Sequence, residues 1–205
     1  DRDGASNLAE ILAGTDPADR DDSPTELTDI AFGDANLRDC VLSAGFRYVT
    51  AVTDLNCSWS GITSLAGLEQ LTGLESFRFR GNNVTDFSAL TSLPRLVDLD
   101  LGDATLSDLD FLSALTALET LNLSNAGIDS AAQVGTLPRL RSLRLGNNNL
   151  RSMPDLDHLA LEVIDLSRNE LTTLPALPDS LVSLAVSDNP LTGLGDLSAM
   201  SALET

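Results

Sequence analysis

A spaced recurrence of leucine constrains this chain more than any other feature. Its template is L-x-x-L-x-L-x-x-N-x-[LIV], a spacing that matches neither a helical stripe nor simple alternation. The residues at the fourth template position are Leu55, Phe77, Leu99, Leu121, Leu143, Ile164 and Leu184. The first five follow at intervals of 22 residues, and the last two at 21 and 20. Seven copies at a nearly constant interval indicate stacked structural repeats.

The physics of stacked repeats explains why the template has apolar residues and asparagine at fixed positions. One repeat cannot bury its own apolar face, so neighbouring copies must share a continuous core. The L-x-L part predicts a short β-strand with its leucines pointing inward. The asparagine position needs a side chain that both donates and accepts, because a tight turn leaves inward backbone groups without strand partners.

Asparagine does not fill that position in every copy. The residues found there are Ser60, Asn82, Ala104, Ala126, Asn148, Asn169 and Asn189. The two alanines cannot make the side-chain hydrogen bonds, so a looser or water-bridged spine is expected at their copies. The shorter copies carry Pro175 and Pro178, which disfavour helix and predict extended segments on the outer side.

These residues resemble the leucine-rich-repeat family. The 22-residue copies, with a second half such as Phe87-x-x-Leu90-x-x-Leu93, are most similar to the bacterial internalin-type surface proteins. The resemblance covers residues 52–205, which hold seven copies and the start of an eighth at Leu203. It implies an α/β repeat solenoid, a leucine-rich-repeat horseshoe with a parallel concave β-sheet on which partners dock.

Residues 25–51 are expected to form an N-terminal cap, because an open solenoid end exposes apolar surface. A helix is predicted in residues 34–45, with Asp34 as its N-cap and Gly45 as its C-terminal stop. One stripe of this helix carries Leu37, Cys40, Val41 and Ala44. That stripe predicts the face that packs against the first repeat.

Cys40 and Cys57 are the two cysteines of the chain. Cys40 is expected to face the solenoid, and Cys57 occupies an inward position of the first strand, so a disulfide between them would pin the cap. Two buried thiols are the alternative, which an intracellular protein would favour.

Residues 1–24 form an acidic segment that carries the second part of D-x-[DN]-x-[DN]-G-x5-E. The stretch from Asp1 to Pro17 is similar to the thrombospondin-type-3-like calcium repeats of bacterial surface proteins. The candidate calcium ligands are Asp1, Asp3, Ala5, Asn7 and Glu10. The first ligand of such a loop would precede residue 1, so weak calcium binding or none is expected. A solvated acidic linker is the alternative.

Side chains that flank the inward strand residues form the candidate binding face. Neighbouring strands lie about 4.8 Å apart, so Arg78 and Arg80 should lie beside Asp98 and Asp100. Arginine and tryptophan are typical interface anchors, although such Arg–Asp pairs can also act only to stabilise a sheet. The scarcity of aromatic residues on this face favours a polar or charged protein partner over a sugar. The residues assigned to partner binding are Trp59, Arg78, Arg80, Asp98, Asp100, Asn122, Arg144 and Asp165.

Composition disfavours several other functions. The formal net charge of −19 repels phosphate backbones and anionic lipid headgroups, so neither nucleic-acid binding nor membrane insertion is expected. No apolar run approaches the length of about 20 residues that spans a bilayer. The only histidine, His158, lies on a predicted outer segment, and the sequence carries no catalytic motif, so no enzyme and no catalytic residue is expected.

Three functions remain open at this point. The first is protein binding, as a recognition or adhesion module of a secreted or cell-surface bacterial protein. The second is a rigid structural spacer in a larger, calcium-stabilised surface protein. The third is a cytosolic regulatory scaffold, in which both cysteines would be reduced. A monomer or weak self-association is expected, and the partner's identity is not encoded in the repeat.

Overall fold

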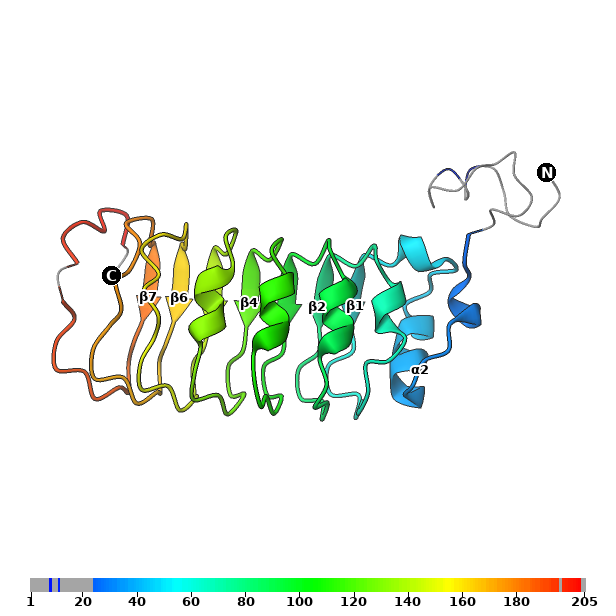
Figure 1. Cartoon of the computed structure of the whole chain (residues 1–205), viewed down its shortest axis with the longest axis horizontal. Helices are drawn as coiled ribbons and strands as arrows, with labels where there is room; N and C mark the ends of the chain where they lie inside the picture. The colour runs from blue at the N-terminus through cyan, green and yellow to red at the C-terminus, as the bar shows by residue number, and fades with distance from the viewer. Residues whose placement is uncertain (1–7, 9–10, 12–23, 196, 204–205) are drawn as a thin grey trace.

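The chain is an elongated solenoid with strands along one side and short 3-10 helices along the opposite side (Figure 1). The computed structural model describes residues 8, 11, 24–195 and 197–203. One seven-stranded sheet runs through it, in the order β1-β2-β3-β4-β5-β6-β7. Its strands are β1 (Asp54–Asn56), β2 (Ser76–Arg78), β3 (Asp98–Asp100), β4 (Thr120–Asn122), β5 (Ser142–Arg144), β6 (Val163–Asp165) and β7 (Ser183–Ala185). The predicted parallel repeat solenoid is thereby confirmed.

The register of the sheet follows the repeat. Each strand pairs in parallel with the next, and the central residue of one strand lies opposite the central residue of its neighbour. Leu55 therefore pairs with Phe77, and Phe77 with Leu99. Because side chains alternate across a strand, these central residues point into the core and their neighbours point to solvent. The predicted columns are confirmed.

The outer, convex side carries a helical turn only in the longer copies. These turns are η3 (Leu68–Gln70), η4 (Ser88–Ser92), η5 (Asp110–Ala114) and η6 (Ala132–Thr136). Beyond Thr136, no described residue is helical, and Pro175 and Pro178 lie in chain that is neither helix nor strand. None of the described helices is long and apolar enough to cross a membrane.

The core is a single continuous stack of aliphatic side chains. It contains two aromatic contacts, one between Phe77 and Phe79 with ring centroids 5.0 Å apart, and one between Phe87 and Phe111 at 5.2 Å. The second pair joins adjacent copies on the convex side. Each coil is thus buried by its neighbours rather than by itself, as the repeat physics requires.

The N-terminal cap contains η1 (Leu27–Asp29), α2 (Ala35–Ser43) and η2 (Val49–Ala51). Asp34 is the N-cap of α2, as predicted: its Oδ1 accepts hydrogen bonds from Asn36 N (2.8 Å) and Leu37 N (3.1 Å). Its Oδ2 accepts from Thr63 N at 2.9 Å, so one carboxylate joins the cap to the first repeat. Leu37 and Val41 are buried, but Ala44, the C-cap residue of α2, is exposed.

A disulfide joins Cys40 on α2 to Cys57 beside β1, with their Cα atoms 5.8 Å apart. The disulfide predicted from the position of Cys40 on the cap helix and of Cys57 at the first strand is therefore present. It closes a loop with a sequence separation of 17 residues and fixes the cap on the first coil. Helix α2 thus covers the apolar end of the solenoid and is held there by the disulfide.

Breaking this bond should loosen the cap. The double variant Cys40→Ser, Cys57→Ser should lose about 3 kcal/mol of the free energy of unfolding, because the unfolded chain regains the entropy that the closed loop removes. Urea denaturation of both proteins measures the difference. Thiol titration of the denatured, unreduced wild type should find no free thiol, and two reactive thiols would contradict the disulfide.

A spine of buried asparagines joins successive coils. Asn148 Nδ2 donates to Leu123 O and to Leu145 O, both at 2.9 Å, and its Oδ1 accepts from Ala126 N (3.0 Å) and Ile128 N (3.2 Å). Comparable bonds are made by Asn82, Asn169 and Asn189. The side chain therefore satisfies inward backbone groups of two coils at once, as the donor and acceptor argument predicts.

At the copy of Ala126, backbone groups make two of the bonds near the spine. Leu106 N donates to Ala126 O at 3.2 Å, and Ala104 N donates to Leu101 O at 3.2 Å. These bonds occupy backbone groups that an asparagine at position 126 would otherwise bond, as the comparison with Asn148 indicates.

Removing one spine asparagine should be costly. Asn148→Ala should lower the free energy of unfolding by about 2–3 kcal/mol, because it leaves several buried backbone groups unsatisfied. The matched control is Asn149→Ala, whose exposed side chain makes one long bond of 3.3 Å to Gly127 O and whose loss should cost about 0.5 kcal/mol or less. Equal losses in the two variants, measured by urea unfolding, would contradict the role of the spine.

Candidate functional site

The open face of the sheet is the candidate site, and we call it the concave face. It consists of the strand residues on either side of each inward residue and of the second residue after each strand. These side chains stand in columns, because the parallel register repeats from coil to coil. A rigid backbone thus carries side chains that are free to vary.

The predicted Arg–Asp proximity is found on the first three strands. Arg78 Nη2 lies 3.5 Å from Asp54 Oδ2 and 4.0 Å from Asp98 Oδ2. Arg80 Nη1 lies 3.9 Å from Asp100 Oδ2. Both guanidinium groups are therefore paired within the chain, so each would have to give up or share its aspartates to bind a partner.

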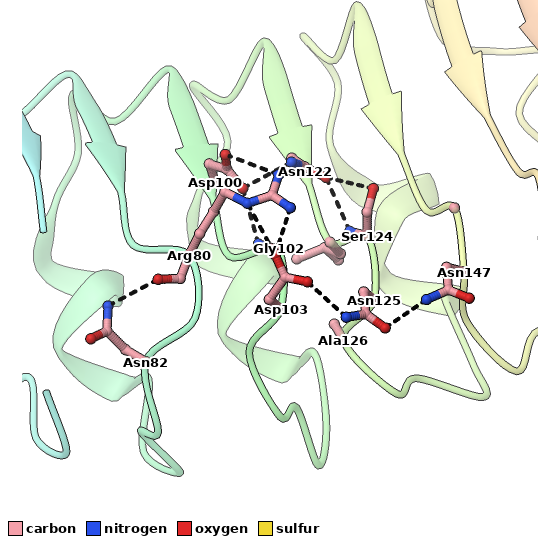
Figure 2. Close-up of polar contacts among 12 residues, drawn as sticks. Arg80, Asn82, Asp100, Gly102, Asp103, Asn122, Ser124, Asn125, Ala126 and Asn147 are labelled. Atoms are coloured by element: carbon pink, nitrogen blue, oxygen red, sulfur yellow. Dashed lines mark hydrogen bonds and ion pairs between the residues drawn. The ribbon is translucent and has the colours of Figure 1, made fainter. Parts of the chain in front are cut away.

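Polar contacts continue from Asp100 across the next strand (Figure 2). Asn122 Nδ2 donates to Asp100 Oδ1 at 2.9 Å, and Asn122 Oδ1 accepts from Ser124 N (3.0 Å) and Ser124 Oγ (2.7 Å). Asn122 is 8% exposed. Although it was assigned to partner binding, its position makes it a buried support for the face rather than an open contact.

One further column was missed in the sequence. In each coil the second residue after the inward pair of the strand adopts a left-handed backbone, with φ between 57° and 63°. The residues of this left-handed column are Trp59, Gly81, Asp103, Asn125, Asn147, Arg168 and Asp188. Glycine, asparagine and aspartate tolerate this conformation best. Their recurrence one position before the spine residue was the signal that could have revealed the column.

Side chains of this column form a ladder along the rim of the concave face (Figure 2). Asn147 Nδ2 donates to Asn125 Oδ1 at 2.6 Å, and Asn125 Nδ2 donates to Asp103 Oδ1 at 2.7 Å. From the other side, Arg80 Nε donates to Asp103 Oδ2 at 3.1 Å. The bond from Asn125, together with the bond and charge of Arg80, outweighs partial burial and lowers the pKa of Asp103.

Trp59 begins the same column at the N-terminal end of the concave face, where the sequence predicted it. Its side chain is 69% exposed and its backbone is left-handed, with φ 58°. Its ring lies against Gly81, where a Cβ atom would collide with ring carbons Cδ2, Cε3 and Cζ3. Its backbone N–H donates to Arg80 O at 2.7 Å, which ties the residue to the next coil.

Arg144 and Asp165 lie on β5 and β6, opposite each other in the register. Asp165 Oδ1 accepts from Ser167 N at 2.9 Å. Arg144 is exposed and, within the described part of the chain, forms no ion pair. Of the three arginines assigned to the concave face, it is the one whose charge is open to a partner.

The predicted calcium ligands Asp1, Asp3, Ala5, Asn7 and Glu10 lie outside the described residues. Among the residues that are described, no group of three or more histidine, cysteine, aspartate or glutamate side chains could hold a metal ion.

One hollow of the surface, with a volume of about 1030 Å³, lies among the C-terminal coils, away from the concave strands. Leu177, Pro178 and Met200 line it together with hydroxyl and carboxylate groups. His158 is not part of this lining, and its Nε2 lies 2.9 Å from Gly135 O. The hollow therefore does not bring the imidazole of the chain to a nucleophile.

Asp103 should make stability depend on pH. A carboxylate with a lowered pKa stabilises the fold above its unfolded-state pKa, and this contribution disappears as the pH falls through the folded-state value. Wild type should therefore lose more free energy of unfolding than Asp103→Asn between about pH 6 and pH 2. Asparagine suits the variant because it tolerates the left-handed backbone.

The measurement is urea unfolding across that pH range. Asp179→Asn, at an exposed carboxylate on the outer side, is the control and should follow wild type closely. Parallel curves for wild type and Asp103→Asn would contradict a stabilising role for this carboxylate.

No protein-family model and no curated protein matches the sequence. Solved structures do match. Internalin C2 from Listeria monocytogenes is similar with a TM-score of 0.69 and 21% identity, over 88% of this chain and 95% of that one. A leucine-rich-repeat protein of Leptospira interrogans is similar with a TM-score of 0.63 and 23% identity, over 76% of this chain and 48% of that one. The chain therefore has the leucine-rich-repeat fold of these bacterial proteins.

Proposed function

We propose that this chain is a non-enzymatic protein-binding module, acting in recognition or adhesion, and that it binds through the concave face. The observation that carries the proposal is Arg144 on β5, an exposed arginine that forms no ion pair among the described residues, whereas the other two arginines of the concave face are paired. Arginine is a frequent anchor of protein interfaces because its planar guanidinium makes several hydrogen bonds at once.

Rigidity supports the same proposal. The sheet, the asparagine spine and the rim ladder hold the backbone of the concave face in place before a partner arrives. A pre-organised surface loses less conformational entropy on association, so more of its contact energy becomes affinity.

We further propose that the protein is secreted or displayed on a bacterial cell surface. The disulfide supports this location, because such bonds persist in oxidising compartments and are rare in the cytosol. The similarity to an internalin of Listeria monocytogenes agrees with it. A cytosolic scaffold would leave the Cys40–Cys57 bond without a compartment that maintains it.

The test is capture of partners from extracts of host cells and of bacteria by the immobilised protein. A partner retained by wild type should bind at least about tenfold more weakly to Arg144→Glu, because the substitution replaces an open cation with an anion at an interface anchor. The control is Arg139→Glu, the same charge change at an exposed arginine of the same coil, before strand β5.

Retention by Arg139→Glu with loss by Arg144→Glu would support the concave site. Equal retention by both variants would exclude Arg144 as an anchor. Capture of nothing by wild type would favour the rigid spacer.

A further inference from the structure

Trp59 has a larger exposed fraction, 69%, than any other large apolar side chain that the structure describes. Most copies of the left-handed column fill this position with glycine, asparagine or aspartate, which adopt a positive φ readily. A bulky residue at φ 58° is strained, and its exposure means that burial does not offset the strain. Strained residues of this kind concentrate at sites of function.

The position after Trp59 in the column makes room for its ring. Gly81 is the only glycine of the column, and any larger residue there would collide with ring carbons of Trp59. One face of the indole therefore rests on the Gly81 backbone, and the exposure of the side chain leaves the other side open to solvent. The result is a flat aromatic platform at the N-terminal end of the concave face.

A cation is the group that such a platform attracts most strongly, because the indole face carries negative electrostatic potential. None of the described residues supplies that cation. The chain contains no lysine, and the neighbouring Arg78 and Arg80 are paired with aspartates. Among the described residues, the one arginine that stacks on an aromatic ring is Arg47, on Tyr48.

The net charge of the whole molecule also favours a cationic partner group. A net charge of −19 raises the local concentration of cationic partners and repels anionic ones. We infer that the open face of Trp59 receives a lysine or arginine side chain from a basic segment of the protein partner. This inference rests on the proposed function and specifies the chemistry of the partner at one end of the concave face.

The protein carries its own reporter for this contact, because Trp59 is the only tryptophan. The probes are a synthetic peptide of alternating arginine and glycine, its counterpart with glutamate in place of arginine, and a neutral oligosaccharide such as chitohexaose. The arginine peptide should change the tryptophan fluorescence saturably, and the other two should leave it unchanged. A response to the oligosaccharide instead would overturn the inference in favour of a sugar.

Calorimetric titration separates the platform from the overall charge. Trp59→Leu keeps the net charge and should bind the arginine peptide about two- to fivefold more weakly than wild type, the range of exposed cation–π contacts. Phe46→Leu, at a partly exposed aromatic residue beside the cap helix, is the control and should bind as wild type does. Equal affinity in wild type and Trp59→Leu would mean that the peptide is held by overall charge alone.

A second pair of variants tests the geometry while keeping the tryptophan. Gly81→Ala should displace the ring and abolish the fluorescence response, because the new methyl group occupies its place. Gly127→Ala introduces alanine at a similar φ, 72° against 63°, where nothing lies within 4 Å of the new atom. It therefore shares the backbone cost and should keep the response. A full response in Gly81→Ala would overturn the platform.

These results are independent of the test with Arg144. A partner that depends on Arg144 but binds Trp59→Leu as tightly as wild type would leave the binding function standing and remove only the cationic contact.

Discussion

Everything in this structure depends on one constraint: no coil can bury its own apolar side or satisfy its own inward backbone groups. Asn148 illustrates it, since its amide bonds the carbonyl oxygens of Leu123 and Leu145 and accepts from Ala126 N. Packing and hydrogen bonding therefore run along the solenoid axis, from each coil to the next. The concave face inherits its regular columns from this coupling, because each strand must lie in register with its neighbours.

The same constraint explains why the fold could be predicted from the sequence. With a repeated L-x-L and a repeated turn, only one parallel register buries every inward residue. The strand positions, the core residues and the cap could therefore be predicted from the sequence alone. The prediction was wrong in one detail of the cap. Ala44 continues the apolar stripe of the helix in sequence, but as the C-cap residue it is exposed and does not pack on the first repeat.

The site could be predicted only to the level of columns. Strand spacing places Arg80 beside Asp100, and Nη1 lies 3.9 Å from that carboxylate, but spacing does not tell that Nε and Nη2 of Arg80 also bond Asp103. Asp103 lies outside the strand, in a turn whose left-handed backbone the leucine template does not describe. Whether Arg144 is paired or open likewise depends on side-chain geometry, which a repeat leaves undetermined.

The left-handed column connects the scaffold to the chemistry of the rim. Its backbone conformation recurs because each coil must turn at the same point, and that turn presents one side chain per coil outward, in a line. Where the line carries Asp103, Asn125 and Asn147, the side chains bond one another and stiffen the rim. At Gly81 the line carries no side chain, which leaves space for the ring of Trp59. The same turn therefore carries a hydrogen-bonded ladder from Asp103 to Asn147 and, at the N-terminal end, one open aromatic platform at Trp59.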